Sequence, residues 1–213
     1  MNKSKTTSPV LLKRIDELLI SAHSYLEKND EVYYLGEYTN RQPASHSDFN
    51  QLILNYKKDP SRKGKPEWEY KEVSIKKAAD MLRLSLLQTN GFPSRIKHAL
   101  LVPIPPHASK SDLEHDDRNL RMLLNFMPRG NVHELIEQKE TRAPLHESNK
   151  RDPKTLEENY RINPPNQGLE FKEIWLFDDV LRKGTHFRAI SNLLCKRFPN
   201  IPIVGFFIAR SIN

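Results

Sequence analysis

Two adjacent aspartates, Asp178 and Asp179, follow a predicted apolar strand at 173–177. An apolar run of this length is typical of an inner strand of an α/β sheet, and ligands of such sheets bind at the carboxyl ends of the strands. Adjacent carboxylates repel each other, so they need cations or hydroxyl donors nearby, and a sugar diol or a magnesium-bound ligand supplies these. The aspartate pair therefore indicates a ligand site in which both side chains turn toward one crevice.

The short segment after the aspartates has the composition of an anion-binding turn, with Gly184 inside it and a helical pattern starting at residue 186. Backbone N–H groups of a tight turn, together with the dipole of the following helix, favour a terminal phosphate. Side chains that can donate hydrogen bonds flank the glycine: Arg182, Lys183, Thr185 and His186. A diol-binding acid pair beside a phosphate turn predicts a ribose-5-phosphate site.

The elements around this turn predict the fold class. A strand at 173–177, a helix at 186–198 and a strand at 202–209 form one β-α-β unit, which implies a parallel, right-handed crossover. An apolar run rich in β-branched residues, "HALLVPIPP", predicts a further buried strand that empties into a loop. The sequence thus predicts an α/β protein with an open, mostly parallel, twisted sheet flanked by helices.

The N-terminal part predicts an extension of residues 1–47, serving as a hood, ahead of an α/β domain at 48–213. An amphipathic helix is expected over 9–26, with Leu11, Ile15, Leu18, Leu19 and Ala22 along one stripe, followed by a short strand in "EVYYLGEYT". Periodicity alone leaves "FNQLILNYKKD" open between strand and helix.

Three later segments complete the predicted domain. A helix capped by Ser74 is expected after an exposed loop in "DPSRKGKPEWEYKE", and a second helix in "DDRNLRMLLNFM". Residues 139–168 have little apolar periodicity and several prolines, which favours a long loop acting as a functional lid.

The charge pattern, the length of the apolar runs and the cysteine count limit the classes of protein to which this chain can belong. The formal net charge is +7, but basic residues are interspersed with acids throughout, which argues against direct nucleic-acid binding and suits a phosphate-rich small ligand. No apolar run reaches the roughly 20 residues of a membrane span, and no signal-peptide pattern opens the chain, so a cytoplasmic location is expected. Cys195, the single cysteine, excludes an internal disulfide and is expected to be a buried thiol.

The stretch "WLFDDVLRKGTHF" resembles the phosphoribosyl pyrophosphate (PRPP) signature of type I phosphoribosyltransferases, in which an apolar strand and two acids precede a turn rich in threonine and glycine. In that family the turn reads as two threonines, a glycine, a small residue and a threonine. The corresponding positions here are Arg182, Lys183, Gly184, Thr185 and His186. The acids and the glycine match, whereas long cations replace both threonines before the glycine.

Other segments resemble the ComF-type and amidophosphoribosyltransferase-like branch of this family, in the same order along residues 48–210. "LLVPIPPHASK" resembles its strand and pyrophosphate loop, which implies that Lys110 and Arg118 face pyrophosphate. "TRAPLHESNKRDPKTLEENYRIN" resembles its mobile hood loop, which implies that Arg142, Lys150 or Arg151 closes over the ligand. The zinc-binding cysteines at the start of many such proteins are missing here.

The resemblance implies a phosphoribosyltransferase that binds PRPP or a nucleotide with Mg²⁺, in which Asp178 and Asp179 contact the ribose hydroxyls, directly or through the metal. A homodimer is common among similar proteins, but the sequence leaves the oligomeric state open. Two alternatives remain open: a PRPP- or nucleotide-sensing module without turnover, and an effector of a bacterial phage-defence system that acts on a nucleotide pool or a protein partner. The acceptor base or amine is not indicated by these residues.

Overall fold

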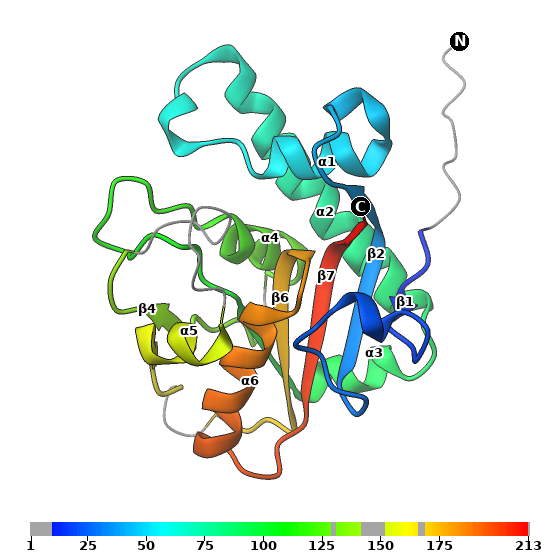
Figure 1. Cartoon of the computed structure of the whole chain (residues 1–213), viewed down its shortest axis with the longest axis vertical. Coiled ribbons are helices and arrows are strands. Elements are labelled where there is room, and N and C mark those ends of the chain that lie inside the picture. The colour runs from blue at the N-terminus through cyan, green and yellow to red at the C-terminus, as the bar shows by residue number, and fades with distance from the viewer. Residues whose placement is uncertain (1–9, 129–130, 142–151, 166–168, 213) are drawn as a thin grey trace.

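The chain is built on a β-sheet with helices on both faces (Figure 1), in a computed structural model that describes residues 10–128, 131–141, 152–165 and 169–212. Within these residues, five strands form the main sheet, in the spatial order β1 (Lys13–Arg14), β2 (Glu31–Thr39), β7 (Ile203–Ile212), β6 (Glu173–Leu181) and β3 (Ala99–Pro103). β1 is antiparallel to β2, and all other neighbours run parallel. The predicted α/β class with a mostly parallel sheet is confirmed.

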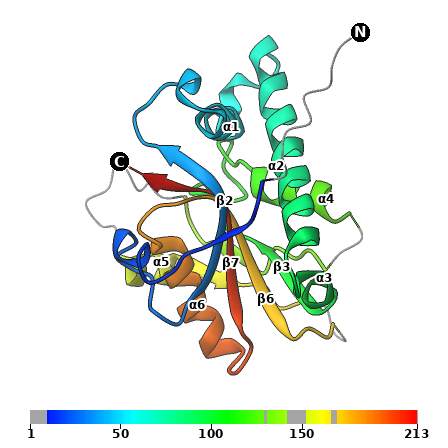
Figure 2. The ribbon, with the colours of Figure 1, turned by 90° about the vertical axis from the view of Figure 1, so that its right-hand side faces the viewer.

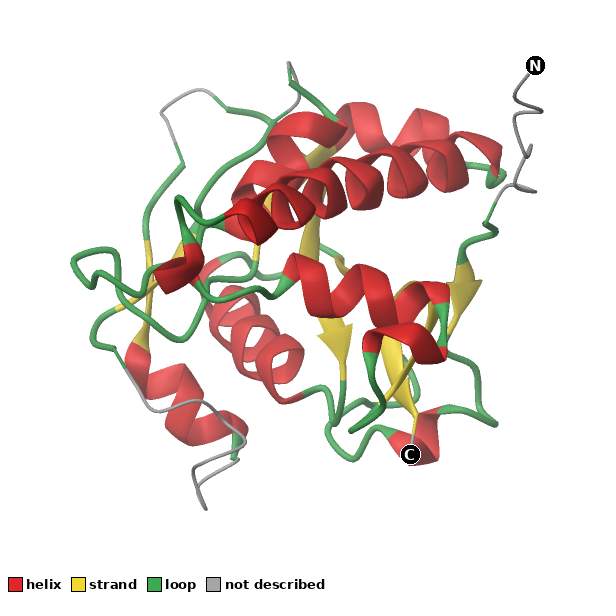
Figure 3. Ribbon diagram, turned by 90° about the horizontal axis from the view of Figure 1, so that it is seen from above, coloured by secondary structure: helices red, strands yellow, loops and turns green. Residues whose placement is uncertain are grey.

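Helices cover both faces of the sheet, as Figures 2 and 3 show. One face carries α1 (Asp48–Tyr56), α2 (Glu69–Gln88), α3 (Phe92–Arg95) and α4 (Arg118–Phe126). The other face carries α5 (Pro153–Asn159) and α6 (Thr185–Arg197). Because strand side chains alternate between faces, two hydrophobic cores form: Trp175 lies in the core under α1 to α4, where it contacts Phe92 of α3, and its neighbours Ile174 and Leu176 lie in the core under α5 and α6.

The predicted β-α-β unit is present as β6, α6 and β7, with β6 and β7 parallel. Residues of α6 that point inward, such as Phe187, Ile190 and Leu194, are buried, so the apolar spacing that predicts the helix also fixes its packing face. β6 extends to Leu181, four residues beyond its predicted end, so the aspartates lie inside the strand rather than after it.

The helix expected over 9–26 is wrong for the residues described there. β1 pairs with β2, and the Asp16 carboxylate accepts hydrogen bonds from the backbone N–H groups of Leu18 and Leu19, which closes a turn instead of a helix. A short 3₁₀ turn at Ile20–Ala22 follows. Two leucines of the predicted stripe face solvent, with Leu11 63% and Leu18 86% exposed, whereas Leu19 packs against the core.

Several other boundaries differ from expectation. The segment "FNQLILNYKKD", which periodicity leaves undecided between strand and helix, contains most of the helix α1, whose N-cap is Ser47. The expected loop at 59–72 instead contains two 3₁₀ turns and the start of α2, so Ser74 is a buried residue inside the helix rather than its cap.

Within 139–168, α5 and β5 (Tyr160–Ile162) form, and β5 pairs antiparallel with β4 (Ile136–Gln138). The long loop predicted there is therefore wrong for these residues. Cys195 is exposed, not buried, because it lies on the outer face of α6.

The N-terminal part contributes directly to the sheet. β2 pairs with β7 from Glu31 to Thr39, so residues of the predicted extension lie beside the last strand of the predicted domain. The division at residue 48 stays a prediction. Among the described residues, no helix is both long enough and apolar enough to cross a membrane.

Candidate functional site

A cleft of about 690 Å³ opens at the carboxyl end of β6. This volume is within the range of about 300–1,000 Å³ that small-molecule sites occupy. The side chains that line it come from the ends of β6 and β3, the start of α4 and α6, and the residues after α1. Those used below are Lys57, Asp116, Arg118, Asn119, Asp178, Asp179 and the turn at 182–186.

Asp178 and Asp179 reach the same side of the sheet although they are adjacent in a strand. Phe177 and Val180 both pack in the core under α1 and α4, whereas strict alternation over three residues would place them on opposite faces. The alternation therefore shifts at the two aspartates. The Asp179 N–H donates to Asp178 Oδ1 at 2.8 Å, which is the local contact at this shift. The prediction that both acids turn toward one crevice is consistent with this geometry.

Asp179 is the buried anchor of the cleft, with 4% of its surface exposed. Lys57 Nζ lies 3.1 Å from its Oδ1, and Arg118 Nη2 lies 2.7 Å from its Oδ2. Burial opposes ionisation of this carboxyl, but the charges and hydrogen bonds of the two cations outweigh burial and lower its pKa below the ordinary value. Asp179 is thus a charged group whose two oxygens are already engaged by the protein.

Asp178 has a different environment. Asn119 Nδ2 donates to its Oδ1 at 3.0 Å, and its Oδ2 has no protein hydrogen-bond partner in the described part of the chain. Burial, followed by the charge of Asp179, raises the pKa of Asp178 to about 7. One aspartate is therefore fixed as an anion, and the other can exchange a proton near neutral pH.

This difference predicts a pH dependence of stability. The folded protein binds the Asp178 proton more tightly than the unfolded chain, whose pKa is near 3.8, so the group contributes stability at low pH that is lost as pH rises from about 4 to about 7. Asp178→Asn removes this proton, and the fall in unfolding free energy between pH 5 and pH 7 should be shallower in that variant. Urea denaturation across this range measures it, with Glu170→Gln, an exposed carboxylate, as the control. Equal slopes in the wild type and the Asp178 variant would contradict the assignment.

The ion pairs extend from Asp179 into the interior. Arg118 Nη1 also donates to Asp116 Oδ2 at 2.8 Å, and Asp116 Oδ2 accepts from the fully buried Lys71 of α2 at 2.6 Å. Burial lowers the pKa of Lys71, and the Asp116 charge opposes that shift. This chain of charges connects α2 and α4 with β6, so it fixes the position of the aspartates relative to the helices.

The turn at 182–186 has the backbone that its sequence suggests. Gly184 has φ +82° and precedes the first turn of α6, where backbone N–H groups lack partners within the helix. A Cβ at this glycine would lie 2.8 Å from Leu26 Cδ2. Both its conformation and this close approach therefore require glycine.

A segment from the N-terminal part supports this turn from behind. Tyr25 N–H donates to the Lys183 carbonyl at 2.9 Å, and the ring Nδ1 of the buried His23 contacts the Arg182 carbonyl. Arg188 donates from Nε to the Tyr25 carbonyl at 3.0 Å and pairs with Asp30. Since these contacts occupy the carbonyls, the turn is fixed while the Arg182 and Lys183 side chains remain exposed, and the turn lines the cleft.

His186 connects the cleft with the segment 139–168, for which the sequence predicts a lid. The Tyr160 hydroxyl lies 2.7 Å from His186 Nδ1, and Tyr160 begins β5 directly after α5. Tyr160 is buried, so β5 is anchored beside the cleft by this contact.

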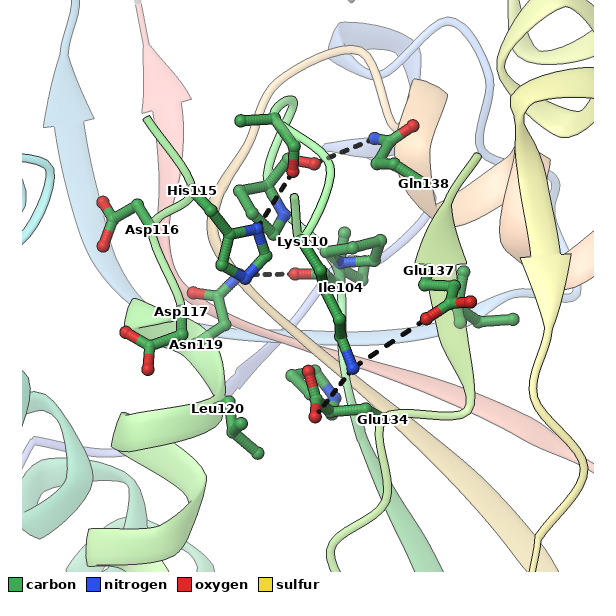
Figure 4. Close-up of a pocket in the computed structure, with 15 residues that line it drawn as sticks. Ile104, Lys110, His115, Asp116, Asp117, Asn119, Leu120, Glu134, Glu137 and Gln138 are labelled. Carbon is green, nitrogen blue, oxygen red and sulfur yellow. Dashed lines mark hydrogen bonds and ion pairs between the residues drawn. The ribbon is translucent and has the colours of Figure 1, made fainter. Parts of the chain in front are cut away.

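The structure brings most of the predicted site residues together. Those that line the cleft are Asp178, Asp179, Arg182, Lys183, Gly184, Thr185, His186 and Arg118. Lys110 lines a smaller cavity that adjoins the cleft, where Figure 4 shows it directed at Glu134 and Glu137, with Nζ 3.0 Å and 3.9 Å from their carboxylates. Arg142, Lys150 and Arg151 lie outside the described residues.

Sequence reasoning missed three side chains that act on the aspartates or the turn, namely Lys57, Asn119 and His23. Lys57 is 122 positions from Asp179, so its pairing has no local signal. Asn119 immediately follows Arg118, which the sequence does predict as a site residue, and this adjacency is the one local signal for it. His23 lay in the segment predicted as a helix, which concealed its contact with the turn.

The residues fit Mg²⁺ only as a partner of a phosphorylated ligand. No cluster of three or more metal-ligating side chains occurs among the residues that the structure describes. Both Asp179 oxygens are engaged, which leaves Asp178 Oδ2 as the oxygen that this pair can offer. Mg²⁺ commonly binds proteins through one or two carboxylates together with ligand phosphates, and this arrangement is compatible with that mode.

No protein-family model matches this sequence, and no curated protein matches it.

Proposed function

We propose that the cleft binds the phosphorylated ribose of PRPP or of a nucleotide, together with Mg²⁺, and that the protein transfers or removes the phosphoribosyl group. The observation that carries the proposal is the order of groups along one β-α unit. An acid pair on β6 is followed within a few residues by a glycine turn with two exposed cations, and then by the N-terminus of α6. The spacing suits a ribose diol at the acids and a 5-phosphate at the turn.

The cleft is lined by acids, which include Asp59, Glu114 and Asp178, as well as by bases, and the exposed positive charge that favours an anionic ligand is concentrated at the turn. The carboxylates of Asp116 and Asp179 are already neutralised by Lys57, Lys71 and Arg118. Arg182 and Lys183 then add positive charge at the mouth of the cleft. A phosphate in the turn would meet both cations and the backbone N–H groups that begin α6.

The residues have distinct roles in this proposal. Asp178 would contact a ribose hydroxyl through its Oδ2, while Asp179 would orient Asp178 and keep Arg118 in place. In the transfer, the C1′–O bond to pyrophosphate breaks with its electron pair leaving on pyrophosphate, an acceptor nitrogen or water forms the new bond to C1′, and the acceptor releases its proton to solvent. Mg²⁺, when bound with the ligand, supplies charge neutralisation for the leaving pyrophosphate.

The decisive binding experiment is calorimetric titration with PRPP, ribose 5-phosphate and a nucleoside monophosphate, each with and without Mg²⁺. PRPP binding that strengthens with Mg²⁺ supports the proposal. Ribose 5-phosphate binding without a Mg²⁺ effect supports the phosphate turn but not the pyrophosphate part. Absence of binding for all three ligands would overturn the proposal.

Arg182→Ala combined with Lys183→Ala is expected to weaken ribose-phosphate binding by at least about tenfold, because two charge-assisted contacts to phosphate are lost. Lys97→Ala combined with Lys172→Ala is the matched control. Both lysines are exposed, lie before β3 and β6 at the opposite end of the sheet, and change the net charge by the same amount. Equal losses in both double variants would mean that net charge, not the turn, determines affinity.

A sensing module is the second candidate, and the engagement of Asp179 favours it. Both its oxygens are in protein ion pairs, so one carboxylate rather than two is available to a ligand and its metal. In this case PRPP or a nucleotide binds, but no pyrophosphate is released when acceptor bases and amines are added. Pyrophosphate release that depends on an acceptor would reject the sensing module.

A further inference from the structure

The outer side of α2 carries large apolar side chains that face solvent. The inner side packs against the sheet and the neighbouring helices, and its residues are buried: Ile75, Ala78, Ala79, Leu82 and Leu86. On the opposite side the exposed fractions are 60% for Tyr70, 56% for Val73, 53% for Leu84 and 61% for Leu87. A row of such side chains on one helix typically marks an interaction surface.

These residues follow a regular spacing. Together with two charged residues they form a row with alternating steps of three and four, which we call the outer stripe: Tyr70, Val73, Lys77, Asp80, Leu84 and Leu87. This is the a/d spacing of a helix that packs lengthwise against another helix. α2 lies along the outside of the molecule (Figure 2), and none of these residues is among those that line the cleft. The stripe can therefore meet a partner without covering the cleft.

The outer stripe is complementary to itself when one copy is reversed. In an antiparallel pair of helices, each a position lies opposite a d position of the partner helix. Tyr70 then meets Leu87, Val73 meets Leu84, and Lys77 meets Asp80, with every contact repeated by the two-fold axis. A parallel pair would instead place Lys77 against Lys77 and Asp80 against Asp80, which repel.

We propose that two copies of this chain associate through antiparallel packing of their outer stripes. Apolar side chains form both ends of the contact, and two Lys77–Asp80 pairs form its centre. Asp80 also pairs with Arg83 of its own helix, so it would lie between that arginine and the Lys77 of the other copy. The central charges select the antiparallel direction, and the four apolar residues provide most of the buried area.

Sedimentation equilibrium from about 1 to about 100 μM, a range that covers weak dimers, tests the proposal. The wild type is expected to dimerise. Leu84→Glu, which places a carboxylate among the apolar contacts twice per dimer, should weaken association by at least about a hundredfold. Leu124→Glu on α4 alters another exposed leucine and should leave the dimer unchanged. Circular dichroism confirms that each variant is folded.

Exchanging the charges of Lys77 and Asp80 tests whether the two helices pack antiparallel. Lys77→Asp alone or Asp80→Lys alone creates two like-charge contacts and should weaken the dimer by at least about tenfold, and the variant with both changes should recover most of the loss. A monomer at all concentrations would overturn the proposal. So would a dimer that Leu84→Glu leaves intact, or a failure of the combined exchange to recover association.

Discussion

Asp179→Asn is expected to lower the free energy of unfolding by about 3 kcal/mol, because it removes the anion between two cations at a buried site. The amide is nearly the same size as the carboxylate, so no cavity forms, but its NH₂ group must face the donors of Lys57 or Arg118. A domain of this size has about 5–15 kcal/mol of stability, so the variant should still fold. Urea denaturation at constant pH measures the change, and ribose-phosphate binding should be lost with it.

A double-mutant cycle separates this effect from general damage. In the Arg118→Met background, Asp179→Asn should cost at least about 1 kcal/mol less, because one of the stranded cations is already gone. Glu17→Gln is the surface control, since Glu17 and its partner Lys28 have side chains 76% and 77% exposed, and its effect on stability should not be measurable. A loss for Asp179→Asn as small as that of the control would show that the buried ion pairs contribute little.

Gly184→Val is expected to lower the free energy of unfolding by about 2–4 kcal/mol and to abolish ribose-phosphate binding. A β-branched residue at φ +82° is strained, at a cost of about 1–3 kcal/mol, and the new side chain must displace Leu26. Moving Leu26 also disturbs the segment that fixes the carbonyls of the turn. Thermal or urea unfolding gives the stability change, and calorimetry gives the binding change.

The structure offers a matched control for the strain. Gly64 has φ +85°, and a Cβ there would meet no atom within 4 Å. Gly64→Val therefore carries the backbone cost alone, and the difference between the two variants reports the contact with Leu26. Leu26→Ala should recover part of the stability of Gly184→Val. If Gly64→Val costs as much, the contact with Leu26 has no energetic role.

The central part of the site could be predicted from the sequence because its signal is local. One β-α unit contains, in order, the apolar run, Asp178, Asp179 and Gly184. Each of these features indicates a property by itself: the run indicates burial, the aspartates indicate charge, and the glycine indicates a left-handed turn. The helix after the turn followed from apolar spacing. The parallel pairing of β6 with β7 followed from the helix between them.

The support of the site could not be predicted because it depends on distant pairing. Asn119 and Asp178 are 59 positions apart, and His23 and Arg182 are 159 apart. The failed N-terminal helix has a similar cause. Ile15 is buried in the core beside α6, and Leu19 packs against that core. These two apolar residues of the predicted stripe therefore contact the core from a turn and not from a helix. Local periodicity cannot distinguish these cases when tertiary packing decides the backbone.

The position of β7 between β2 and β6 has a consequence for the order in which the protein folds. β2 pairs with a strand about 170 positions later, so its inner edge has no partner until β7 has been synthesised. Pairings between such distant segments form slowly, because closing a long loop costs conformational entropy before any stabilising contact forms. During synthesis the inner edge of β2 is therefore unpaired while β3, α4 and β6 are made. We expect the nascent chain to need protection at β2, and the ligand cleft to form only in the last stage of folding.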